Sequence, residues 1–123
     1  MPTALTTGLK TAPGSYPGTI APNGADMVFE AGDVAGNTFV ASGDDLILVL
    51  NSDPTNPYTV TISSEIDPIN NRLGDITAYS LAAGDYAVFG PFETQGWADT
   101  TSGLILLTVS NVAVKVCVIK LVN

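Results

Sequence analysis

The chain of 123 residues has no histidine, a single cysteine and only four lysine or arginine residues. Without histidine, the Ser/His and Cys/His pairs of nucleophilic catalysis are excluded, and a transition-metal site lacks its commonest ligand. The lone Cys117 cannot form a disulfide within the chain, and its place in a valine-rich run predicts a buried, unreactive thiol. These absences favour a structural or binding role over an enzymatic one. We expect no catalytic residue, no metal and no cofactor.

Positive charge is also scarce. Twelve Asp and Glu residues against four Lys and Arg residues give a net charge of −8. Such a chain repels phosphate and has no basic cluster from which counterions could be released, so nucleic acid is not an expected partner. The same acidity favours docking onto a positively charged protein surface.

The carboxylates include two close pairs, Asp44 with Asp45 and Glu65 with Asp67. Neither pair has the regular ligand spacing and the glycine turn of a calcium loop. Two carboxylates facing each other across a cleft, as in a glycosidase, remain a minor alternative that spacing alone does not test. We interpret these residues as solvated loop carboxylates.

Long hydrophobic runs are absent as well. None approaches the ~18–20 residues of a membrane span, and residues 1–5 lack the basic and apolar regions of a signal peptide. We therefore expect no membrane association, and synthesis in a cytoplasm without processing. The chain is nevertheless 46% hydrophobic and only 13% charged, against ~25% charged residues in an average soluble domain. This composition predicts that other subunits cover part of its apolar surface.

Residues 1–36 are predicted to form an extended N-terminal arm. They are rich in Gly, Pro, Thr and Ala, and three Pro/Gly breaks between residues 13 and 24 prevent a helix. Ordering ~30 residues at ~1 kcal/mol each requires on the order of 1,200 Å² of apolar burial. A neighbouring subunit is the natural source of that surface. The apolar anchors of such an arm would be Leu5, Leu9, Tyr16 and Ile20.

Residues 37–123 have the pattern of one all-β domain. The run at 46–51 is apolar up to its last residue, Asn51, as in a strand covered on both faces. Residues 58–63 alternate instead and place Val60 and Ile62 on one face. Residues 64–75 are polar and indicate a surface loop. Strands that recur about every ten residues without an intervening amphipathic helix predict an antiparallel β-sandwich or jelly-roll-like fold. The further strands are expected at 76–81, 86–89, 104–110 and 112–121.

Three aromatic residues, Phe89, Phe92 and Trp97, lie close together around Gly90-Pro91. Rings so near in sequence are consistent with a sugar-stacking platform, a protein-binding hot spot or simple core filling. We expect Phe89 in the core and treat Phe92 and Trp97 as interface candidates. Gly90-Pro91 is expected to set a bend.

The order of segments resembles that of a known family. The series is Gly36–Phe39, Gly43–Asn51, Tyr58–Ile62, Leu81–Asp85 and Gly90–Phe92, closed by the valine-rich Val112–Leu121. Over roughly residues 36–121 it is similar to the head decoration, or cement, proteins of tailed bacteriophages.

The resemblance implies a virion structural protein on the outer surface of an icosahedral phage head, made in the host cytoplasm. Its partners would be the major capsid protein and copies of itself, often as homotrimers, and it would stabilise the shell through many repeated modest contacts. A tail- or fibre-associated structural or carbohydrate-binding β-module is the alternative with the same fold. The candidates for a capsid interface or a self-interface are then Leu5, Leu9, Tyr16, Ile20, Phe92 and Trp97.

Overall fold

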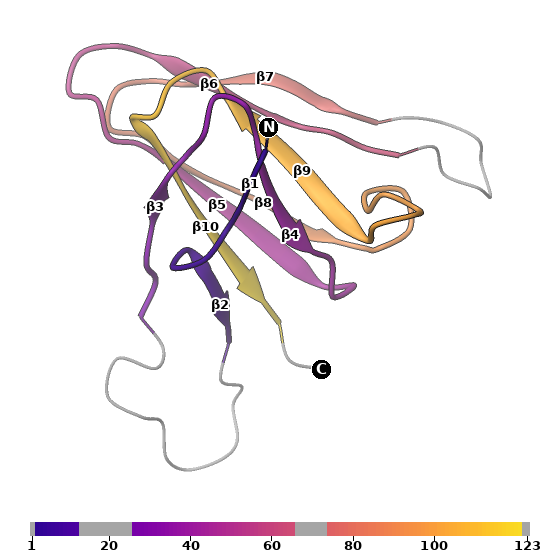
Figure 1. Ribbon diagram of the computed structural model, residues 1–123. Coiled ribbons are helices and arrows are strands. Elements are labelled where there is room, and N and C mark those ends of the chain that lie inside the picture. The colour runs from indigo at the N-terminus through magenta and orange to yellow at the C-terminus, as the bar shows by residue number, and fades with distance from the viewer. Residues whose placement is uncertain (1, 13–25, 66–73, 122–123) are drawn as a thin grey trace.

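A computed structural model describes residues 2–12, 26–65 and 74–121 of the chain (Figure 1). Within these ranges the chain forms strands and turns, and there is no helix that could cross a membrane. The strands are β1 (Thr3–Ala4), β2 (Leu9–Thr11), β3 (Glu30–Ala31), β4 (Asn37–Val40), β5 (Asp45–Asn51), β6 (Tyr58–Ile62), β7 (Ile76–Leu81), β8 (Tyr86–Phe92), β9 (Leu104–Val109) and β10 (Val114–Lys120).

The strands form two sheets that pack as a single sandwich (Figure 1). Sheet A has the order β1-β4-β9-β6-β7, and sheet B has the order β2-β10-β5-β8, with β3 also paired to β10. The prediction of an all-β sandwich is confirmed. Two pairings are parallel, β1 with β4 and β2 with β10. Parallel neighbours require a long connection, and both pairs join the N-terminal residues to strands much later in the chain.

Strand β5 shows how alternation builds the core. Ile47 and Val49 are fully buried between the sheets, whereas Leu46, Leu48 and Leu50 lie half-buried on the outer face of sheet B. The strand is therefore covered completely on one face only, so the prediction of complete cover on both faces is wrong. In β6 the predicted alternation is confirmed for Val60 and Ile62, which are both fully buried. The fully buried residues of the core include Ile47, Val49, Val60, Ile62, Ile105, Leu107, Val114, Val116 and Val118.

Cys117 is fully buried in β10, as predicted. It lies between Val116 and Val118 in the strand, so its side chain points to the opposite face from theirs. Burial is the main cause that raises the pKa of its thiol. A thiol with a raised pKa is a weak nucleophile, which agrees with a structural role.

The described parts of the expected arm belong to the sandwich itself. The side chain of Leu5 is 5% exposed and lies in the chain's own core, and β1, β2 and β3 pair with β4 and β10. The Glu30 carboxylate accepts the backbone N–H groups of Thr6 and Gly8, both at 2.8 Å. Sheet edges and core positions of the same chain thus supply the cover that we had expected from a neighbouring subunit.

Residues on either side of the expected boundary at 36/37 are tied together. Asn37 is 1% exposed. Its side-chain oxygen accepts the N–H of Asp33 at 2.8 Å, and its amide group donates to the carbonyl of Thr3 at 3.3 Å. Within the described residues, 2–12 and 26–36 therefore continue the β-sandwich.

Turns of the sandwich are held by aspartates that accept backbone N–H groups. The clearest is the turn after β5, where one Asp53 oxygen accepts the N–H groups of Thr55 and Asn56 at 2.8 and 2.9 Å. These two backbone bonds, Thr55 first, lower the pKa of Asp53 to about 2. The pKa of Asp33 is lowered first by the Thr3 hydroxyl, that of Asp75 first by the Ser64 hydroxyl, and that of Asp99 first by the backbone N–H of Ser102.

Stability is therefore expected to fall as the solution is acidified. The pKa of Asp53 is about 2 in the folded chain, below the ~3.9 of an unfolded aspartate. Its contribution is thus complete above about pH 5 and is lost as the pH falls from about 4 towards 2. The urea midpoint of the wild type should drop over this interval, and Asp53→Asn should show a shallower drop. An equal fall of the urea midpoint with pH in the two proteins would contradict the assignment of this effect to Asp53.

Candidate interaction surfaces

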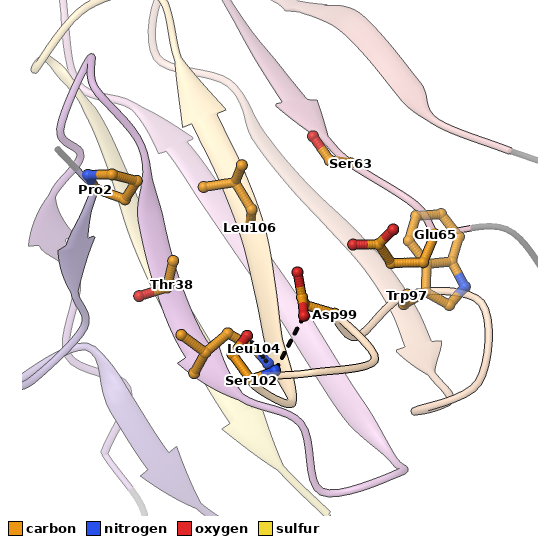
Figure 2. Close-up of a pocket in the computed structure, with 9 residues that line it drawn as sticks. All are labelled: Pro2, Thr38, Ser63, Glu65, Trp97, Asp99, Ser102, Leu104 and Leu106. Atoms are coloured by element: carbon orange, nitrogen blue, oxygen red, sulfur yellow. Dashed lines mark hydrogen bonds between the residues drawn. The ribbon is translucent and has the colours of Figure 1, made fainter.

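The outer face of sheet A carries a hollow of about 210 Å³ (Figure 2). Its floor consists of Thr38 from β4 and of Leu104 and Leu106 from β9. Phe39, next to Thr38 in β4, and Ile105, between Leu104 and Leu106 in β9, are buried in the core. Because successive side chains of a strand point to opposite faces, the floor residues point outward, and each is half-buried.

Loops and the N-terminus form the rim of the hollow. Figure 2 shows Pro2 at one end and Trp97 with Glu65 at the other. The backbone N–H of Glu65 donates to the carbonyl of Gly96 at 2.7 Å, which joins the segment after β6 to the loop that carries Trp97. The remaining lining residues are Ser63, Asp99 and Ser102.

The rim is negatively charged. One Asp99 oxygen accepts the N–H groups of Ser102 at 3.0 Å and Thr101 at 2.7 Å, and these bonds, Ser102 first, lower the pKa of Asp99. The half-buried Glu65 carboxylate adds a second negative charge to the rim. Among the described residues that line the hollow there is no lysine or arginine. A guest with positive charge and an apolar stem would match this surface best.

The two aromatic interface candidates differ in position. Phe92 is 3% exposed and belongs to the core, so its assignment to an interface is wrong: its side chain has almost no surface to offer. Trp97 is half-buried. It packs edge-on against Phe92 with ring centroids 4.6 Å apart, and it also lines the hollow. Trp97 therefore connects the core to the candidate surface.

A second apolar surface lies at the free edge of sheet B. In β8, the side chains of Tyr86 and Val88 are 69% and 61% exposed. Together with Leu48 and Ala87 they line a shallow depression of about 250 Å³. Phe89, which we expected in the core, is half-buried and packs against the core. Its ring centroid lies 5.2 Å from that of Tyr79.

The other sequence candidates fall at several places. Leu5 is a core residue, which corrects its assignment as an anchor for a neighbour, and Leu9 is half-buried against the same core. Tyr16 and Ile20 lie outside the described residues, and so does Asp67.

The Asp44-Asp45 pair is not a solvated pair, because Asp45 is fully buried. Its carboxylate accepts the N–H of Ser42 at 2.9 Å and also the Ser42 hydroxyl. Asp45 thus holds the turn before β5.

The described residues contain no group of three or more side chains able to hold a metal ion. Every buried side-chain nitrogen or oxygen in this part of the chain has a hydrogen-bond partner. Comparison with models of known protein families, with curated proteins and with solved structures finds no match.

Proposed function

We propose that this chain is a decoration, or cement, protein that binds the outer surface of an icosahedral phage head and stabilises the shell. The hollow on sheet A carries the proposal, because it combines an apolar floor, a half-buried tryptophan and an anionic rim. Such a combination of an aromatic anchor with complementary charge is typical of protein-binding surfaces. The partner would be the major capsid protein, through a lysine or arginine side chain.

The size of the hollow also favours a protein partner. About 210 Å³ is less than the ~300–1,000 Å³ of sites that enclose small molecules. A hollow of this size can receive one long side chain from an opposing surface. Many such contacts repeated over a closed shell would give strong attachment even if each contact is weak.

Copy number is the first test of this proposal. Quantitative mass spectrometry of purified virions should find the protein in a ratio to the major capsid protein that is near one or a simple fraction of one. Absence from the virion would refute a virion role altogether.

A substitution in the floor of the hollow tests the proposed surface. Leu106→Lys places a positive charge where a cationic guest would enter, and it should weaken binding to undecorated heads at least about tenfold, or 1.4 kcal/mol. Val112→Lys is the matched control, since Val112 is 58% exposed and lies outside the hollow. Circular dichroism should show both variants folded. Equal binding by both variants would exclude this face as the capsid contact.

The same side chains favour one alternative, a carbohydrate-binding module of a tail or fibre. Trp97, the two carboxylates and the serine hydroxyls are the kinds of group that stack on and hydrogen-bond to sugars. This alternative requires only a few copies per virion and binding to a glycan array that Trp97→Ala abolishes.

A further inference from the structure

The outer edge of β8 presents backbone groups that pair with no other described strand. On β5, the N–H of Asn51 donates to the carbonyl of Asp85 next to β8. The N–H of Ser52 donates to the carbonyl of Ala113 next to β10. Odd-numbered residues of β5 therefore bond to β8, and even-numbered residues bond to β10.

The register assigns which β8 residues face β5. Val49 lies opposite Ala87, and Ile47 lies opposite Phe89, so Ala87 and Phe89 make the bonds to β5. The backbone N–H and carbonyl groups of Tyr86 and Val88 point away from β5. No hydrogen bond from the described residues reaches them.

Other edges of the two sheets are less suited to pairing. The strands β1, β2 and β3 are two or three residues long. In β7 the pairing with β6 shifts its register between Val60 and Ile62. At this shift Ala78 has a φ of 49°, and its N–H donates to the Thr61 hydroxyl. A bulge of this kind protects an edge strand. The regular part of β8, Tyr86–Phe89, has no such protection.

We propose that β8 pairs edge to edge with β8 of a second copy of this chain, antiparallel and about a two-fold axis at Ala87. In this register Tyr86 of each copy lies opposite Val88 of the other, so the outward-pointing backbone groups of both strands bond to each other. Tyr86 and Val88 side chains also become cross-strand neighbours, an aromatic and β-branched pair that stabilises sheets. Strand β8 is thus complementary to itself.

Charge supports a second copy as the occupant. A chain with a net charge of −8 repels its own copies over most of its surface, but residues 76–92 contain one charged residue, Asp85. In the proposed register the two Asp85 residues are separated by four strand positions, about 14 Å, which exceeds the Debye length of about 8 Å at physiological salt. The β8 edge is therefore a place where two copies can meet with little repulsion.

The oligomeric state of the purified protein tests this inference independently of any capsid. Light scattering after size-exclusion chromatography should give two chain masses for the wild type and for Val112→Lys, and one chain mass for Val88→Lys. Val88→Pro should also give one mass, since it removes an N–H that points away from β5. A measured mass of one or three chains for the wild type would overturn the two-fold pairing. A measured mass of two chains for Val88→Lys would overturn it as well.

A cysteine substitution tests the register without relying on a disrupted edge. In a non-hydrogen-bonded antiparallel pair the Cα atoms are about 4.5 Å apart, within the range of a disulfide. Ala87→Cys should therefore form a cross-linked dimer under mild oxidation on a non-reducing gel, whereas Val112→Cys should not. Failure of Ala87→Cys to cross-link in a protein that runs as a dimer would place the contact elsewhere.

Discussion

Replacement of Asn51 by aspartate is expected to lower the free energy of unfolding by about 3 kcal/mol or more at neutral pH. Asn51 is fully buried at the end of β5. Its side-chain amide donates to the carbonyls of Asn56 at 2.8 Å, Leu81 at 3.1 Å and Ala82 at 3.3 Å. Its side-chain oxygen accepts the N–H of Asp53 at 3.0 Å. Aspartate has the same shape, but its carboxylate has no N–H to donate to these three carbonyls. It would instead place a buried negative charge next to three carbonyl oxygens.

The effect should be specific to this position. Asn111→Asp is the matched control, because the Asn111 side-chain oxygen accepts the N–H of Ala113 at 2.9 Å, a bond that aspartate makes equally well. Urea unfolding at pH 7 should show a change within about 0.5 kcal/mol for the control. Similar losses for the two variants would mean that charge alone, and not the three carbonyls, destabilises the protein.

Phe92→Ala is expected to lower the free energy of unfolding by about 3–5 kcal/mol. The ring is 3% exposed and packs against Trp97, so its removal leaves a cavity in the core and withdraws the support of Trp97. Val112→Ala, at a position 58% exposed, should change stability by no more than about 0.5 kcal/mol.

This experiment also separates a core role from an interface role. A loss below about 1 kcal/mol for Phe92→Ala, together with weaker binding to heads, would return Phe92 to the interface candidates. A large loss in the isolated protein supports the core position.

The two proposed surfaces are compatible. A two-fold axis perpendicular to sheet B leaves the outer faces of both sheets in the same orientation in each copy. The hollows on sheet A of the two copies would then face the same side, so a pair could engage two neighbouring capsid sites at once. Linked binding of this kind increases apparent affinity when the spacing of the sites matches.

Several features could be predicted from local patterns. The alternation of 58–62 identifies β6 and its buried Val60 and Ile62, and the apolar run around Cys117 predicts its burial. The surface hollow was missed because residues 104–109 are nearly all apolar, so their sequence does not tell the core face from the outer face. No pattern in the sequence marks Leu104 and Leu106 as its floor.

Other features depend on residues far apart in the chain. Gly90 adopts a φ of 112° within β8, and a side chain there would begin 2.6 Å from the carbonyl oxygen of Asp45. The sequence predicts that this strand ends at Phe89, but β8 continues through Gly90 to the buried Phe92. Sequence around residue 90 contains no information about the position of Asp45.

The fold class, most strand positions and the absence of histidine-based chemistry could be predicted from the sequence, because alternation and composition are local properties. The burial of Leu5 and Asp45, and the position of β8 at the edge of the described sheet B, depend on the three-dimensional arrangement of the strands. Those outcomes depend on pairings such as β2 with β10, which join the two ends of the chain. Strand order follows from the sum of such long-range contacts, and no short stretch of sequence specifies it.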